Sequence, residues 1–170
     1  AYFLAETQYS KKLKPRQVLV IDEAHNIELQ LSKFIEITIS ERFSKSVLKI
    51  DWPGNMTLRQ SVNWVKTIYL PRLSEHVKFV KQGIKKYIGM ADRLNEFTSL
   101  AKKLEMLDKH ECKINRFLET YRPDNWVVNR QEGYGRTLEK IEFKPIDVST
   151  FSEDLLFRMG AKVIMMSATI

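Results

Sequence analysis

The chain has 170 residues, of which 44% are hydrophobic and 29% charged, and its formal net charge is +7. This length allows one well-packed core with a sizeable insertion, and the composition is typical of globular proteins. The sequence shows no secretory signal and no run of the ~20 apolar residues that a membrane-spanning helix needs. Its single cysteine, Cys112, excludes an internal disulfide. We therefore expect an intracellular protein, cytoplasmic or nuclear, that is neither secreted nor held in a membrane.

A short apolar run near the start of the chain ends abruptly in acids. Residues 17–21, Gln-Val-Leu-Val-Ile, contain the continuous aliphatic run Val18–Ile21, which predicts a short strand buried on both faces. The tetrapeptide Asp-Glu-Ala-His, residues 22–25, follows it directly. Residues 25–35 are then expected to form a helix, and residues 40–50 a second short one with Ser40 as its N-cap.

The middle of the chain, residues 57–122, is rich in helix-forming residues. Apolar residues three and four positions apart predict a helix with one apolar seam made by Leu100, Leu104, Leu107, Ile114 and Leu118. Glu111 interrupts that seam, so a long regular coiled coil is not expected. Apolar residues between positions 64 and 97 predict two or three further helices that pack against it. A helical bundle or hairpin is the expected result.

The positive charge is confined to this middle region. Residues 55–122 contain 14 basic and 7 acidic residues, whereas the net charge is +1 before them and −1 after them. A localised basic excess favours a polyanionic partner. The alternative is a solvated, lysine-rich helix surface with no partner.

The last part of the chain predicts a return to α/β structure. An extended segment is expected over 138–149, and a helix over 149–160 with a Ser or Thr cap and Gly160 as its stop. A second buried strand, Val163–Met166, then runs into Ser167-Ala168-Thr169. The two apolar strands can pair in one parallel sheet, whose carboxyl edge is where ligands bind in open α/β folds. Residues 22–25 and 167–169 would meet at that edge.

Two adjacent acids at the end of a buried strand, here Asp22 and Glu23, are typical of a site that binds and hydrolyses a nucleotide. A carboxylate at the end of a buried strand can hold Mg²⁺ beside phosphates, and a second one can activate the attacking water. The alternative interpretation is that Asp22 and Glu23 only cap the helix that follows.

Two segments resemble a known family. Residues 18–28, V-L-V-I-D-E-A-H-N-I-E, resemble motif II, the Walker B box, of superfamily 2 helicases. Residues 141–170 resemble the segment that leads into motif III, S-A-T, in the XPD/DinG family of DNA helicases. In that family a helical insertion, the Arch domain, separates these motifs, and here a helical, basic stretch lies between them. The resemblance covers the whole chain in layout, but residue-level matching is confined to the two ends.

The resemblance implies an α/β fold in which part of a RecA-like parallel-sheet motor domain is interrupted by a mostly α-helical, Arch-like insertion. The expected boundaries are residues 1–35 for the first motor segment, 36–136 for the insertion and 137–170 for the second motor segment. The implied activity is ATP hydrolysis coupled to 5′–3′ translocation on single-stranded DNA, and protein partners of the insertion are also expected.

By position, the resemblance assigns Mg²⁺ binding to Asp22 and water activation to Glu23, with ATP as the nucleotide. His25, Ser167 and Thr169 would couple the nucleotide state to movement on the strand. The Arch forms one wall of the DNA path in this family, so its basic residues are candidate phosphate contacts: Lys81, Lys85, Lys86, Arg93, Lys102, Lys103, Lys109, Lys113 and Arg116. Trp64, Tyr87 and Trp126 could stack on bases, although core positions are favoured for them.

Other parts of the family pattern are missing from these 170 residues. They contain no G-K-[S/T] phosphate-binding loop and none of the arginine motifs of the second motor domain. We expect the chain to be part of a longer protein and not to hydrolyse ATP alone. An iron–sulfur cluster is possible in that parent, but its cysteine ligands are not in this chain. Two alternatives remain: a non-catalytic helical module that binds nucleic acid or a partner, with an accidental D-E-A-H, and a degenerate paralogue that keeps the fold without the motor.

Overall fold

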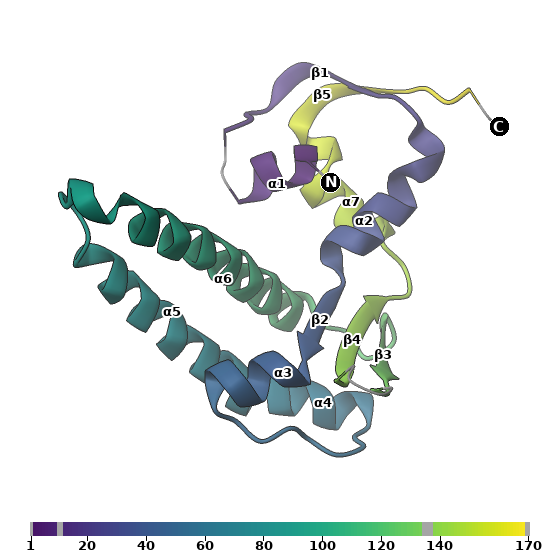
Figure 1. Cartoon of the computed structure of the whole chain (residues 1–170). Coiled ribbons are helices and arrows are strands. Elements are labelled where there is room, and N and C mark those ends of the chain that lie inside the picture. The colour runs from purple at the N-terminus through teal and green to yellow at the C-terminus, as the bar shows by residue number, and fades with distance from the viewer. Residues whose placement is uncertain (1, 10–11, 134–137, 169–170) are drawn as a thin grey trace. The chain divides into compact units, whose positions relative to one another are not determined.

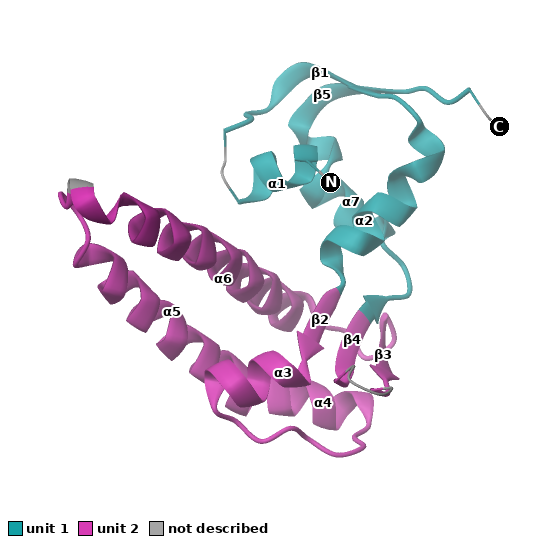
Figure 2. Ribbon diagram, in the orientation of Figure 1, with its two compact units in different colours: residues 1–36, 144–170 teal, residues 37–143 magenta. Residues whose placement is uncertain are grey.

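The computed structural model describes residues 2–9, 12–133 and 138–168, and its fold is mixed α/β (Figure 1). The chain divides into two compact units, residues 1–36 with 144–170, and residues 37–143 (Figure 2). The second unit is therefore inserted in the sequence of the first.

The first unit is built around two parallel strands. Its elements in chain order are α1 (Tyr2–Gln8), β1 (Arg16–Ile21), a 3₁₀ turn (Ala24–Asn26), α2 (Ile27–Ile35), α7 (Ser149–Leu155), a 3₁₀ turn (Phe157–Met159) and β5 (Gly160–Met165). Strands β1 and β5 pair in parallel, with Leu19 opposite Val163 and Ile21 opposite Met165. The predicted parallel pairing of two segments about 140 residues apart is confirmed. The core of the unit is formed mainly by helix residues, among them Leu4, Leu31, Phe34 and Leu155, together with Leu156 directly after α7.

The predictions that the first strand is buried on both faces and that the second is buried are wrong for the described residues. On one face, the side chains of Val18, Val20 and Ile164 are 47%, 53% and 49% exposed. On the other face, Leu19, Ile21 and Val163 are only partly exposed, and Met165 at the end of β5 is 58% exposed. The cause is that the described sheet has two strands, and helices cover one face of it.

Gly160 has a different role from the expected helix stop. Its φ of −136° and ψ of 134° are extended, and it is the first residue of β5. A Cβ atom at this position would lie 2.5 Å from Leu19 Cβ and 2.8 Å from Leu19 N.

The start of helix α7 also differs from the expected Ser or Thr cap. Asp147 accepts hydrogen bonds there from Ser149 N (2.8 Å) and Ser149 Oγ (2.6 Å). These bonds hold the pKa of Asp147 below its usual value.

We expect Gly160→Ala to destabilise the chain by about 1–3 kcal/mol, because the strands must separate to admit the methyl group. Gly83→Ala is the matched control, since a Cβ at Gly83 meets nothing within 4 Å. Gly83 lies within a helix, so this control should gain about 0.5–1 kcal/mol. Urea unfolding followed by circular dichroism measures both changes. Equal stability of Gly160→Ala and the parent chain would contradict the close approach.

The second unit combines a helical hairpin with a small antiparallel sheet. Its elements are β2 (Ile37–Ser40), α3 (Glu41–Phe43), a π-helical turn (Ser44–Leu48), α4 (Leu58–Trp64), a second π-helical turn (Val65–Tyr69), α5 (Leu70–Lys85), a 3₁₀ turn (Ala91–Arg93), α6 (Leu94–Thr120), β3 (Trp126–Gln131) and β4 (Lys140–Pro145). The strand order is β2-β4-β3, and β2 and β4 are antiparallel with Ile37 opposite Phe143. The expected hairpin is confirmed as α5 and α6, and Ser40 caps α3 as expected by accepting a bond from Phe43 N.

The core of this unit runs from the hairpin to the sheet. Leu73, Val77 and Val80 of α5 are buried, as are Leu107 and Ile114 of α6. The interrupting Glu111 lies at the interface of the two helices, where it accepts a hydrogen bond from the Ser74 hydroxyl of α5.

The aromatic residues confirm the core interpretation for two of the three candidates. Trp126 and Trp64 are 2% and 7% exposed, so neither can stack on a base. Phe117 of α6 packs between the helix and the sheet, with ring centroids 4.6 Å from Trp126 and 5.0 Å from Phe143. None of the helices in the described residues is long and apolar enough to cross a membrane.

Candidate functional site

The carboxyl edge of the β1–β5 pair joins the two polar segments that the sequence places far apart. Beyond the paired strands, Met166 N donates to Ile21 O and Ala24 N donates to Met166 O, each at 2.9 Å. These backbone bonds extend the parallel register past Asp22 and up to Ser167. The tetrapeptide 22–25 and the segment after β5 are thus held side by side by the sheet itself.

His25 is the side chain that connects the two segments. Its Nδ1 lies 2.9 Å from Ser167 Oγ and 3.2 Å from Glu23 Oε2. Its Nε2 lies 3.0 Å from Asn26 Nδ2. Since the Asn26 amide nitrogen is a donor, Nε2 is the acceptor and Nδ1 carries the proton of the neutral ring. That proton points to the hydroxyl of Ser167 and the carboxylate of Glu23, so the His25 ring contacts both groups through one nitrogen.

Asn26 was not singled out by the sequence interpretation, although it fixes the tautomer of His25. Its only sequence signal is its position directly after the histidine. Thr169, which the resemblance groups with Ser167, lies outside the described residues.

Glu23 sits in a backbone conformation that L-residues rarely adopt. Its φ and ψ are 52° and 45°, in the left-handed helical region, which costs a non-glycine residue about 1–3 kcal/mol. Lys49 is the other non-glycine residue with positive φ in the described part of the chain. The turn at Glu23 ends the strand and starts the 3₁₀ turn within one residue. It aims the Glu23 carboxylate at the His25 ring and away from a capping position.

The capping interpretation of the acids is therefore wrong for Glu23. Glu23 occupies the N-cap of the 3₁₀ turn, but its side chain makes no capping hydrogen bond. Asp22 Oδ1 accepts a bond from Glu23 N at 2.9 Å, which fixes the Asp22 carboxylate against the backbone. The other Asp22 oxygen has no hydrogen-bond partner among the described residues.

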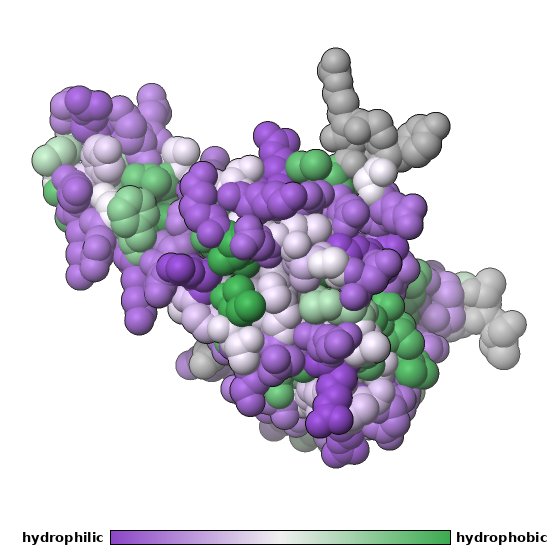
Figure 3. Space-filling model, turned by 90° about the horizontal axis from the view of Figure 1, so that it is seen from below, coloured by the Kyte–Doolittle hydropathy of each residue, from purple (hydrophilic) through white to green (hydrophobic). Residues whose placement is uncertain are grey.

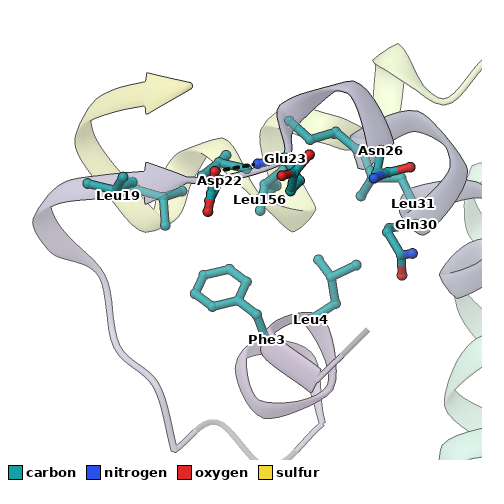
Figure 4. A pocket seen from close by; sticks show the side chains of 12 residues that line it. Phe3, Leu4, Leu19, Asp22, Glu23, Asn26, Gln30, Leu31 and Leu156 are labelled. Carbon is teal, nitrogen blue, oxygen red and sulfur yellow. Dashed lines mark hydrogen bonds between the residues drawn. The ribbon is translucent and has the colours of Figure 1, made fainter. Parts of the chain in front are cut away.

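A hollow of about 450 Å³ lies beside the acids. Its floor is apolar and includes Phe3 and Leu4 of α1 and Leu31 of α2, and Asp22 and Glu23 lie at its rim (Figure 4). No lysine or arginine of the described residues lines it. The hollow therefore supplies carboxylates and apolar contacts, but no cation to neutralise a phosphate.

The described residues contain no group of three or more His, Cys, Asp or Glu side chains that could hold a metal ion. They do not form a cage for a tightly held cation. Mg²⁺ is commonly bound by one or two carboxylates together with waters and substrate phosphates. The exposed Asp22 fits that second mode, in which the ion arrives with the nucleotide.

The nine candidate nucleic-acid contacts fall into three sets in the second unit. Three are paired with carboxylates: Lys81 with Asp108 at 3.1 Å, Arg93 with Glu96 at 3.0 Å, and Lys109 with Glu105 at 2.7 Å. Two, Lys113 and Arg116, take part in other contacts. Within the described part of the chain, four are exposed with no carboxylate partner: Lys85, Lys86, Lys102 and Lys103. Of the nine candidates, these four are the most available to a polyanion.

No protein-family model and no curated protein matches this chain.

Proposed function

We propose that the chain belongs to the motor of an ATP-dependent DNA helicase that resembles the XPD/DinG branch of superfamily 2. Residues 1–36 and 144–170 would be part of its RecA-like domain, and residues 37–143 its Arch-like insertion. The observation that carries this proposal is the contact of His25 with Ser167 at the carboxyl edge of a parallel strand pair.

The chemistry at this edge supports the roles implied by the resemblance. Asp22, at the end of β1, would bind the Mg²⁺ of a Mg²⁺–ATP complex, and the ion would supply charge neutralisation at the phosphates. Glu23 is the base that accepts a proton from the attacking water. His25 holds Glu23 and Ser167 on one ring nitrogen, so a shift of the Glu23 carboxylate would alter its bond to the segment after β5.

The non-catalytic alternative explains less of the geometry. An accidental D-E-A-H in a binding module has no reason to hold Glu23 in a left-handed conformation or to meet Ser167 across 142 residues. A degenerate paralogue would keep this geometry without turnover, and measurement of ATP hydrolysis distinguishes it.

We expect the 170-residue chain to bind single-stranded DNA in a strongly salt-dependent manner. If the four unpaired lysines each neutralise one phosphate, the logarithm of the affinity should fall with the logarithm of salt concentration with a slope of about −3. Fluorescence anisotropy of a labelled oligonucleotide measures this slope. Lys102→Gln should reduce its magnitude, whereas Lys81→Gln should have a smaller effect because Lys81 is already paired with Asp108. No binding at low salt would contradict the role of the insertion as a wall of the DNA path.

A further inference from the structure

The exposed surface of the chain offers apolar areas and polar clusters. Figure 3 shows hydrophobic atoms in green among hydrophilic ones in purple on one face of the molecule. Apolar atoms are common on protein surfaces and by themselves indicate no ligand. A polar cluster is more informative where each contact specifies a donor and an acceptor. The contacts around His25 at the carboxyl edge of the β1–β5 pair do so.

Asn26 contacts a different nitrogen of the His25 ring from the one that Glu23 and Ser167 contact. Its amide nitrogen, Nδ2, lies 3.0 Å from His25 Nε2. His25 Nδ1 lies 2.9 Å from Ser167 Oγ and 3.2 Å from Glu23 Oε2. All four residues belong to the first unit, and Figure 4 shows Glu23 and Asn26 on the turn that follows β1. Asn26 therefore acts on the ring from outside the groups assigned to the reaction.

The contacts at the two ring nitrogens agree on the position of the proton. A carboxylate only accepts hydrogen bonds, so Glu23 requires a proton on Nδ1. An amide nitrogen only donates, so Asn26 requires an unprotonated Nε2. An imidazolium, or the tautomer with its proton on Nε2, would bring two N–H groups against each other at Asn26. The geometry thus favours one neutral tautomer from both sides of the ring.

Hydrolysis of a nucleotide would remove one of these two constraints. In the proposed function Glu23 is the base that takes a proton from the attacking water. A Glu23 carboxylate that has turned to the water no longer draws the Nδ1 proton of His25. Asn26 takes no part in that reaction and keeps its donor at Nε2. The Ser167 hydroxyl, which can accept a hydrogen bond, then has the Nδ1 proton without competition from Glu23.

We propose that Asn26 is a positioning residue that keeps the proton of His25 on Nδ1 while Glu23 is engaged with water. The Nδ1–H group is shared between Glu23 and Ser167 before hydrolysis and is donated to Ser167 alone during it. Engagement of Glu23 at the nucleotide therefore strengthens the contact across the sheet edge. This role in coupling rests on the proposed function, whereas the tautomer is a property of the chain itself.

The first test reads the tautomer of His25 in the 170-residue chain. Long-range ¹H–¹⁵N correlation spectra of the histidine-labelled chain distinguish a protonated ring nitrogen from an unprotonated one. They are recorded at pH ~8, above the titration range of an ordinary imidazole. The chain has three histidines, and the spectrum of His25→Gln identifies the signals of His25. We expect a protonated Nδ1 and an unprotonated Nε2.

Asn26→Asp separates the contribution of Asn26 from that of Glu23. It keeps the shape of the side chain but replaces the donor by an acceptor, so Nε2 should become protonated. Glu23→Gln alone should keep the proton on Nδ1, and the double variant should lose it. Asn63→Asp is the matched control, because Asn63 is an exposed asparagine of α4 in the second unit. It should leave the His25 signals unchanged.

The second test measures coupling in the protein that carries residues 1–170 together with a phosphate-binding loop. Phosphate release and translocation along labelled single-stranded DNA give the ATP consumed per nucleotide moved. Asn26→Asp should raise this ratio about fivefold or more, the lower end of typical coupling between two sites. Asn63→Asp should leave the ratio as it is in the parent.

Three results would overturn the proposal. They are a protonated Nε2 in the unsubstituted chain, a proton that stays on Nδ1 in Asn26→Asp, and an unchanged ratio of ATP to nucleotides in Asn26→Asp. Absence of ATP turnover in the unsubstituted parent would contradict the proposed function and, with it, the role of Asn26 in coupling. It would not alter the tautomer seen in the spectra, so the two failures are distinguishable.

Discussion

Glu23→Gln should abolish ATP turnover while leaving ATP binding intact, in the protein that carries residues 1–170 together with a phosphate-binding loop. An amide cannot accept the proton of the attacking water, and loss of such a base lowers turnover by about 10²–10⁴-fold. The amide keeps the size of the carboxylate and an oxygen for the His25 proton, now 3.2 Å from Glu23 Oε2. Steady-state ATPase assays with single-stranded DNA, together with binding of a fluorescent ATP analogue, separate the two quantities.

Glu28→Gln is the matched control for this experiment. Glu28 is an exposed acid in the first turn of α2 and does not line the hollow beside Asp22. The Glu28→Gln substitution removes the same charge a few residues away from Glu23, so the ATP turnover of this variant should equal that of the parent. Unaltered turnover in Glu23→Gln would remove Glu23 from the mechanism. A similar loss in both variants would show that charge near the site matters and that the position of the base does not.

The sequence predicts the pairing of β1 with β5 because each of the two strands can be recognised from its local pattern. Each strand is a continuous aliphatic run followed by small or acidic residues, and two such runs have few ways to pair. The hairpin is predictable for the same reason, since its seam repeats at helical spacing through Leu107 and Ile114. Burial of the strands is not predictable in this way. It depends on which elements cover Val18 and Ile164, and an aliphatic run carries no information about its neighbours.

The fine geometry of the site also exceeds what the sequence can supply. Residue types place Asp22 and Glu23 at a strand end, but they give no signal for the left-handed conformation of Glu23, where the strand passes into the 3₁₀ turn. The role of Asn26 depends on the orientation of the His25 ring. At the hairpin, exposure of Leu94 cannot be told from burial of Leu107, because both occupy apolar positions of one helix.

Acidification should destabilise the chain through His110, which bridges the hairpin. His110 Nε2 lies 2.9 Å from the Tyr69 hydroxyl, and the two rings meet edge to face at 5.9 Å. Burial, with a smaller contribution from the charge of Lys113, lowers the pKa of His110 to about 4. Burial raises the pKa of Tyr69, so the hydroxyl stays protonated and donates to the neutral imidazole.

The direction of the effect follows from linkage between protonation and folding. In the unfolded chain His110 has its ordinary pKa of ~6.5, whereas in the folded chain its pKa is about 4. The stabilising contribution is therefore complete above pH ~6.5 and is lost as the pH falls toward 4. Lowering the pH from about 7.5 to about 5 should cost about 2 kcal/mol, and His76, whose pKa is also lowered by burial and by Lys103, adds to the loss.

His110→Gln isolates the contribution of this one ring. Its amide can still accept a bond from the Tyr69 hydroxyl, but it does not titrate, so the difference in unfolding free energy between the two pH values should shrink by most of the 2 kcal/mol. Urea unfolding of parent and variant at both pH values measures this difference. Aspartate and glutamate side chains stay largely ionised at both pH values, because their ordinary pKa values, about 4, lie below the lower pH of about 5. If the variant loses as much stability as the parent, the acid sensitivity originates elsewhere, and burial of His110 does not hold its imidazole neutral.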